Sequence, residues 1–141
     1  MRAVWLKRGK VTNTVTLLAS IALVGFVWLT LFQVLLALGF PLGRLAWGGA
    51  QRVLSPKLRR ASGFSACLAA FGALCVAQAL GLLAWVPAVA LRPALFVLAG
   101  LFGLSLIANA LSKSRVEQIH GVVLTLVLCL GSLAAAFVAS A

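Results

Sequence analysis

Residues 13–38 read NTVTLLASIALVGFVWLTLFQVLLAL and contain no Asp, Glu, Lys, Arg or His. A helix rises about 1.5 Å per residue and the hydrocarbon core of a bilayer is about 30 Å thick, so this stretch is long enough to cross a membrane once. It is apolar all round, whereas an outer helix of a soluble protein needs a polar face. The stretch therefore predicts a transmembrane helix.

Three further charge-free blocks follow, at residues 61–83, 94–111 and 121–140. Each is about 18 to 23 residues long, which is enough or nearly enough for one crossing. We predict an all-α fold in which residues 1–141 form one integral membrane domain, a four-helix transmembrane bundle with both termini on one side. A signal peptide is the competing interpretation of the N-terminus, but the apolar run is too long and no clean cleavage site follows it.

The charge balance excludes several chemistries. The chain has 12 Lys and Arg against a single acidic residue, Glu117, and its net charge is +11. One carboxylate cannot supply the pairs that glycosidases, aspartic proteases and two-metal enzymes need. The basic residues lie at the predicted helix ends with Trp5, Trp47 and Trp85, which is typical of interfacial anchoring. Anionic lipid headgroups are therefore the expected partner, and nucleic acid is not.

Local motifs predict where the helices begin and end. Pro41 disfavours helical geometry in the residue before it, so the first helix should end at GFP, residues 39–41. Ser55 followed by Pro56 predicts the start of the second helix near 56. Ser114 and Glu117 have the spacing of a capping box and are the predicted caps of the fourth helix. The other predicted boundaries are caps at Thr12, Asn13 and Thr14 for the first helix, closure of the second at Trp85 and Pro87, and a third-helix start at Pro93.

The orientation in the membrane follows from counting basic residues on each face. Four crossings place loops 39–60 and 112–120 together, and these carry Arg44, Arg52, Lys57, Arg59, Arg60, Lys113 and Arg115. The opposite face carries Arg2, Lys7, Arg8, Lys10 and Arg92. Seven against five places the two loops in the cytoplasm, although the dense basic N-terminus argues for the reverse.

The connection between the first two helices, residues 39–56, is unusual for a loop. Its first part, GFPLGRLAWGG at 39–49, interleaves glycines with large apolar side chains. It is too apolar for a solvated loop and too rich in glycine for a stable helix, so we expect it to lie at the membrane interface, against the bundle. The candidate lipid-contacting residues here are Arg44, Trp47, Lys57, Arg59 and Arg60.

Gln33, Gln78 and Asn109 are polar side chains within the predicted helices. They can form hydrogen bonds between helices or line the pathway of a solute, and both interpretations stay open. We expect the Asn109 carboxamide to satisfy backbone groups of the glycine-rich segment, because both should lie near the same face of the membrane.

Small residues recur at every fourth position in two of the predicted helices. One row consists of Ala69, Ala73, Ala77 and Gly81, and the other of Gly131, Ala135 and Ala139. Such rows let backbones approach closely. We expect the two rows to meet each other, or one of them to form a contact between copies of the chain.

The remaining chemical groups indicate no catalytic, cofactor or metal site. Cys67, Cys75 and Cys129 lack the C-x-x-C spacing, and small packing residues are the favoured interpretation. His120 has too few potential ligands nearby for a metal ion. Ser112 and Ser114 stand at helix ends, where serine normally caps rather than attacks.

Three motifs together resemble a group of small bacterial four-helix membrane proteins of uncharacterised function. They are ALGFPLGRLAWGG at 37–49, VLSPKLRRAS at 53–62 and NALSKSRVE at 109–117. The resemblance runs from Gln33 to the start of the fourth helix, and it implies a four-helix fold in the bacterial inner membrane but no activity. The chain departs from the group's pattern at Leu42 and Arg44, where that pattern often has an acidic residue.

These observations favour a non-enzymatic multi-pass protein, either an accessory or scaffold subunit of a larger complex or a self-associating, lipid-interacting bundle. A small channel or carrier for a neutral, anionic or lipidic solute is the alternative. A membrane enzyme acting on lipid or quinone is the third possibility. A hydrated cavity that reaches Gln33, Gln78 and Asn109 would favour transport, whereas a dry bundle would favour a scaffold.

Overall fold

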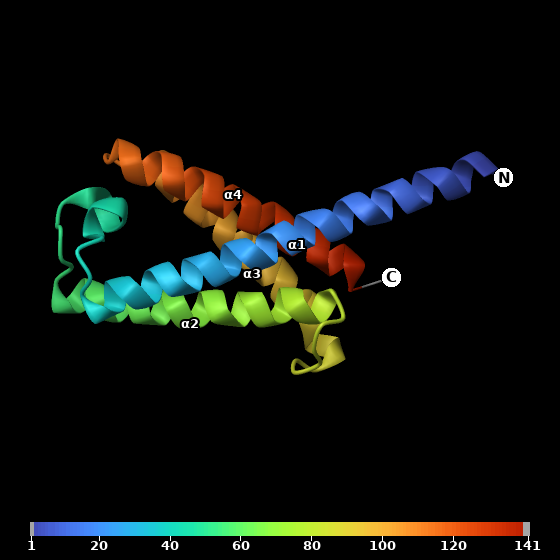
Figure 1. Cartoon of the computed structure of the whole chain (residues 1–141), viewed down its shortest axis with the longest axis horizontal. Coiled ribbons are helices and arrows are strands. Elements are labelled where there is room, and N and C mark those ends of the chain that lie inside the picture. Colours follow the sequence, from blue (N-terminus) through green and yellow to red (C-terminus); the bar gives the residue numbers. More distant parts are fainter. Residues whose placement is uncertain (1, 140–141) are drawn as a thin grey trace.

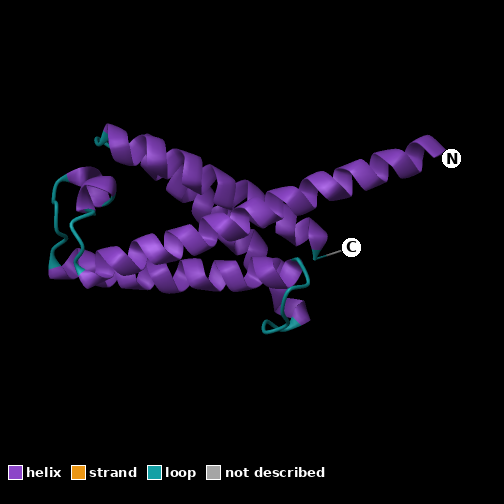
Figure 2. Cartoon of the chain, viewed as in Figure 1, coloured by secondary structure: helices purple, strands orange, loops and turns teal. Residues whose placement is uncertain are grey.

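The computed structural model describes residues 2–139, with side chains described from residue 13 onward. Within this part every regular element is helical, as Figure 2 shows. The elements are α1 (Arg2–Leu38), η1 (Gly43–Leu45), η2 (Trp47–Gly49), α2 (Pro56–Ala79), α3 (Ala88–Ala110) and α4 (Arg115–Val138). Each of the four α-helices contains a stretch long and apolar enough to cross a membrane. The predicted all-α, four-helix architecture is therefore confirmed.

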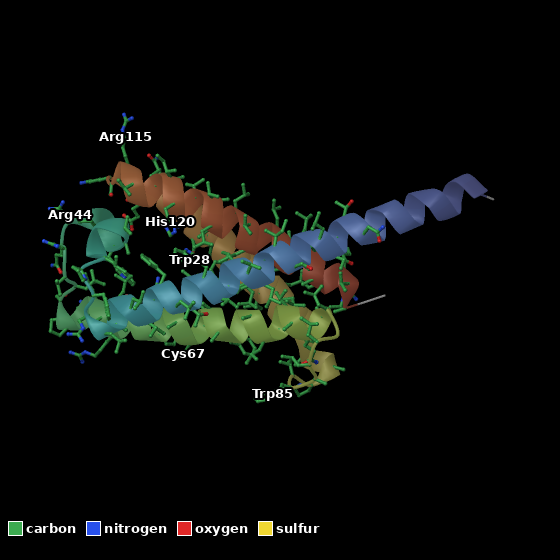
Figure 3. All side chains as sticks on the ribbon, in the orientation of Figure 1. Trp28, Arg44, Cys67, Trp85, Arg115 and His120 are labelled. Carbon is green, nitrogen blue, oxygen red and sulfur yellow. The ribbon has the colours of Figure 1, made fainter. Side chains whose placement is uncertain are left out.

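The helices form two hairpins, α1–α2 and α3–α4, that pack together mainly through α1 and α4 (Figure 1). The connection 39–55 and the turn before α4 lie at one end of the molecule, whereas the α2–α3 connection and both chain ends lie toward the other. Arg44 and Arg115 lie at the first end and Trp85 at the second (Figure 3). Each helix therefore runs opposite to the one before it.

Two helices end in the same glycine-dependent way. At the end of α1, Phe40 N–H donates to the carbonyl of Leu35 and Gly39 N–H to that of Leu36, with Gly39 at φ +93°. Gly81, at φ +74°, ends α2 with the same bonding pattern. Glycine adopts this left-handed conformation without a steric penalty, so it satisfies carbonyls that the helix would leave unpaired.

Several predicted helix boundaries are wrong. α1 continues through residues 12–14 to Arg2. α2 ends at Ala79, before Trp85 and Pro87, because Gly81 stops it first. Pro93 lies inside α3, and Pro87 occupies the N-cap position.

Three other boundaries agree with the local motifs that predict them. α1 ends at Leu38, α2 begins at Pro56 and α4 begins at Arg115. By contrast, the charge-free blocks begin later than α2, α3 and α4. The first turns of these helices carry basic residues, which can reach toward the headgroups while the backbone stays helical. Charge marks the edge of the hydrocarbon region and does not mark the end of a helix.

Phe26 lies at the centre of the packing. It is fully buried, and its ring meets Phe102 of α3 edge to face, with centroids 5.2 Å apart. Gly72 of α2 faces the same ring, and a Cβ at position 72 would overlap it. A large aromatic side chain thus fills the space that a glycine leaves open.

Small residues of α4 also approach α1. A Cβ at Gly131 would overlap the Cβ of Ala22 and lie 3.1 Å from the carbonyl oxygen of Leu18. α1 contacts α2 and α4 far more extensively than these two contact each other. The predicted meeting of the two small-residue rows is therefore not the main packing mode, and Gly131 of the second row meets α1 instead.

Gly131→Ala should destabilise the protein by about 1–3 kcal/mol, because the added methyl group meets the backbone and Cβ of α1, which cannot move independently. Gly100→Ala is the matched control, since a Cβ on this α3 residue has nothing within 4 Å. It should be neutral or slightly stabilising, because Ala is the better helix former. Unfolding in mixed micelles of increasing SDS content measures both variants, and equal effects would show that the α1–α4 contact is loose.

Candidate functional site

A partly open cavity of about 540 Å³ lies against the glycine-rich segment, and we call it the polar cavity because several polar side chains interrupt its mostly apolar walls. All four helices and both 3-10 turns contribute to its walls. Leu29, Phe32, Leu68, Phe102 and Leu124 form much of the apolar part. The polar part contains Gln33, Ser105, Asn109, Lys113, Glu117 and His120. Polar and charged side chains that are far apart in the sequence thus line one cavity.

Glu117, the only acid of the chain, ties three segments together at this cavity. Its Oε2 accepts a hydrogen bond from the Gly48 backbone N–H at 2.9 Å and another from the Ser112 hydroxyl at 2.6 Å. Ser114 is the N-cap of α4, and its hydroxyl accepts from the Glu117 N–H at 3.4 Å. The reciprocal bond of a capping box is not made, because the Ser114 N–H donates to Ser112 Oγ at 3.3 Å. The carboxylate therefore joins η2 to α4, a role beyond the predicted cap.

The backbone around Gly48 is shaped to meet this carboxylate. Trp47, Gly48 and Gly49 all have positive φ, at +55°, +82° and +69°. A Cβ at position 49 would lie 2.8 Å from Ser114 Oγ, so a side chain there would push η2 away from α4. Left-handed backbone costs a non-glycine residue about 1–2 kcal/mol. Trp47 offsets this cost, because its indole N–H donates to the oxygen of the buried Ser62 on α2 at 3.0 Å.

His120 projects from α4 toward Trp28 on α1 (Figure 3). The Trp28 indole N–H donates to His120 Nε2 at 3.3 Å, and the Phe32 ring lies 5.6 Å from the imidazole. An indole nitrogen can only donate, so Nε2 is the acceptor of this bond. The Ser112 hydroxyl meanwhile donates directly to Glu117. No imidazole stands between them, so the arrangement is not that of a nucleophilic serine.

Gln33 is the residue whose bonding is incomplete. Its Oε1 is buried and has no hydrogen-bond partner within the described residues. A buried acceptor left unpaired costs about 1–3 kcal/mol, and this oxygen belongs to a residue that lines the cavity.

Asn109 lies against Gly121, where a Cβ would come within 2.5 Å of its carboxamide. The predicted bond from Asn109 to the glycine-rich segment is wrong: the side chain that bonds this segment from α4 is Glu117, through Gly48. Asn109 instead lines the cavity with Gln33.

Gln78 lies outside this site. Its Oε1 accepts from the backbone N–H groups of Trp85 and Val86, at 2.8 and 2.7 Å, and its Nε2 donates to the Val86 carbonyl at 2.7 Å. It holds the connection between α2 and α3, at the other end of the bundle. The three candidate polar residues therefore divide into two in the cavity and one that is structural.

The candidate lipid-contacting residues also divide. Arg44, Lys57 and Arg60 are exposed, as lipid contact requires. Arg59 is partly buried, and its Nε donates to the carbonyl of Ala37 at 2.8 Å while its guanidinium covers Gly39. Arg59 thus caps the end of α1. Trp47 lines the cavity with part of its side chain and is 41% exposed.

Comparison of the chain with protein-family models, curated proteins and solved structures finds no match. The four-helix architecture implied by the motif resemblance is present, whereas membership in that group stays a prediction. Function must therefore be argued from the polar cavity itself.

Removing the Glu117 carboxylate should free η2. Glu117→Ala leaves the Gly48 N–H and the Ser112 hydroxyl without their acceptor, and we expect a loss of about 1–2 kcal/mol with faster amide exchange at Gly48. Glu117→Gln keeps an acceptor oxygen of the same reach, so it should retain most of the protection. Hydrogen exchange in lipid nanodiscs measures both, and unchanged exchange in the Ala variant would show that the carboxylate does not hold the segment.

Proposed function

We propose that this chain is a multi-pass membrane protein that binds the polar headgroup of a membrane lipid in the polar cavity. The unpaired Gln33 Oε1 carries the proposal, because a buried acceptor at a cavity wall calls for a donor that the protein does not provide. Asn109, Ser105 and Lys113 supply further polar groups on the same cavity.

The composition of the walls suits an amphipathic ligand. Leucine and phenylalanine side chains can contact the upper acyl chains, while the polar groups contact the headgroup. Exposed basic residues, Arg44, Lys57 and Arg60, surround the same end of the bundle and attract anionic headgroups, each by about 1 kcal/mol. This is the lipid-interacting form of the non-enzymatic function that the sequence favours.

The other functions have less support. A channel or carrier needs a polar route across the bundle, yet Gln78 at the other end is hydrogen-bonded to the backbone of Trp85 and Val86. An enzyme that works through an activated serine needs a base, and the Nε2 of His120 is already bonded to Trp28. An accessory subunit remains compatible with the cavity, since a bound lipid can also lie between partners.

The membrane we propose is the bacterial inner membrane, with the cavity end in the cytoplasm. This follows from the motif resemblance and from the seven basic residues of loops 39–60 and 112–120.

Labelling in cells with a membrane-impermeant maleimide tests this orientation. In a background without Cys67, Cys75 and Cys129, single cysteines at Ala50 and Arg115 should stay unlabelled until the cells are permeabilised, because both lie at the cavity end. A cysteine at Ala84 should react at once. Different accessibility at 50 and 115 would contradict the four-crossing topology, and labelling of both in intact cells would reverse the orientation.

Gln33→Met tests whether the cavity binds lipid. Met has a similar length without the unpaired oxygen, so the delipidated variant should be more stable than the native protein, by about 1–3 kcal/mol. Added phospholipid should raise the Tm of the native protein and raise that of the variant far less. Ser132→Ala is the control, because this buried hydroxyl bonds its own helix at Leu128 and does not line the cavity. Equal lipid responses in all three proteins would contradict the proposed function.

A further inference from the structure

We propose that the polar cavity selects a phospholipid with a primary amine, a phosphoethanolamine headgroup, over anionic and choline lipids. This inference rests on the proposed function, since it names the ligand of the same cavity. It is the opposite of what the net charge of +11 suggests, because so basic a protein should favour anionic lipids at every surface.

The position of the single acid is the first argument. Glu117 lines the cavity, and both bonds to its carboxylate from the protein go to Oε2. Gly48 N–H and the Ser112 hydroxyl are neutral donors, so neither of them neutralises the negative charge. Among the described residues no Lys or Arg makes a salt bridge with it. A partly buried carboxylate is stabilised by a cation, and an ammonium group of the ligand provides one.

The second argument is the chemistry of the unpaired acceptor. Gln33 Oε1 needs an N–H or O–H donor. A primary ammonium offers three N–H donors, which suit an amide oxygen as well as a carboxylate. A choline headgroup has a positive charge but no N–H, and a phosphoglycerol headgroup has O–H donors but no positive charge. Of these headgroups, the primary amine alone combines N–H donors for Gln33 Oε1 with a positive charge for the Glu117 carboxylate.

Lys113 completes the charge pattern of the cavity. Its side chain lines the cavity from the turn that leads into α4, four positions before Glu117 in the sequence. A lysine ammonium binds phosphate as a point charge. A positive and a negative group on one cavity wall match a zwitterion whose phosphate and ammonium are a few bonds apart. An aromatic side chain, Trp47, on the same cavity adds a face that attracts cations.

The experiment compares three phospholipids with identical acyl chains, carrying phosphoethanolamine, phosphoglycerol or phosphocholine. Brominated acyl chains quench tryptophan fluorescence on contact, so titration of the delipidated protein with each lipid gives an apparent Kd. We expect the native protein to bind the phosphoethanolamine lipid at least about tenfold more tightly than either of the others, a difference of about 1.4 kcal/mol.

Two variants separate the charge at the cavity from the charge of the whole protein. Glu117→Gln keeps the acceptors for Gly48 and Ser112 but removes the negative charge, and it should bring the three lipids within about threefold of one another. Ala50→Lys raises the net charge by the same amount at an exposed position outside the cavity lining, and it should keep the native preference. Lys113→Gln should weaken the binding of all three lipids by a similar factor.

The outcomes distinguish this inference from the proposed function. Binding that favours the phosphoglycerol or phosphocholine lipid, or a Glu117→Gln variant that keeps the native preference, would overturn the inference while the cavity still binds lipid. Failure of all three lipids to bind would overturn the proposed function as well. If soluble phosphoethanolamine binds as tightly as the lipid does, the ligand of the cavity is a free amine and not a lipid.

Discussion

The packing of α1 against both of its neighbours is the constraint on which the other features depend. Phe26 occupies the space that Gly72 leaves open, and Gly131 of α4 approaches Ala22 one turn earlier on α1. Both contacts require the absence of a side chain on the facing helix. In a membrane, where apolar side chains gain little by leaving lipid for protein, such close packing supplies much of the attraction between helices. The first contact holds α1 and α2 together, and the second joins the two hairpins at a position where both helices carry small residues.

This crossing also explains why a cavity exists at one end. From the crossing of α1 and α4 the hairpins diverge toward the glycine-rich segment, as Figure 1 shows. The 3-10 turns enter the space between them, held to α2 through Trp47 and Ser62 and to α4 through Gly48 and Glu117. A helix could not follow this path, because three successive residues are left-handed. The segment covers part of the opening, and the polar cavity is what remains.

The sequence predicts the four helices well and the site only in part. Long charge-free blocks are a direct consequence of the bilayer's thickness, so the helices follow from composition alone. Gln33 and Asn109 stand out for the same reason, as polar groups in an apolar stretch. The bond between Gly48 and Glu117 joins residues 69 positions apart, and that between Trp28 and His120 joins residues 92 apart. No local pattern encodes such contacts, since they depend on how the hairpins cross.

The two glutamines show how the ends of the bundle differ in hydrogen bonding. The oxygen of Gln78 accepts two short bonds and its nitrogen donates a third, all to the backbone of the α2–α3 connection. Gln33 is the same chemical group at the opposite end, and its oxygen is buried and unpaired. A protein selected for stability alone would place an apolar side chain at position 33, because the unpaired acceptor is a cost without a structural return. That cost is understandable where an outside donor completes the bond, and the only acid of the chain lines the same cavity.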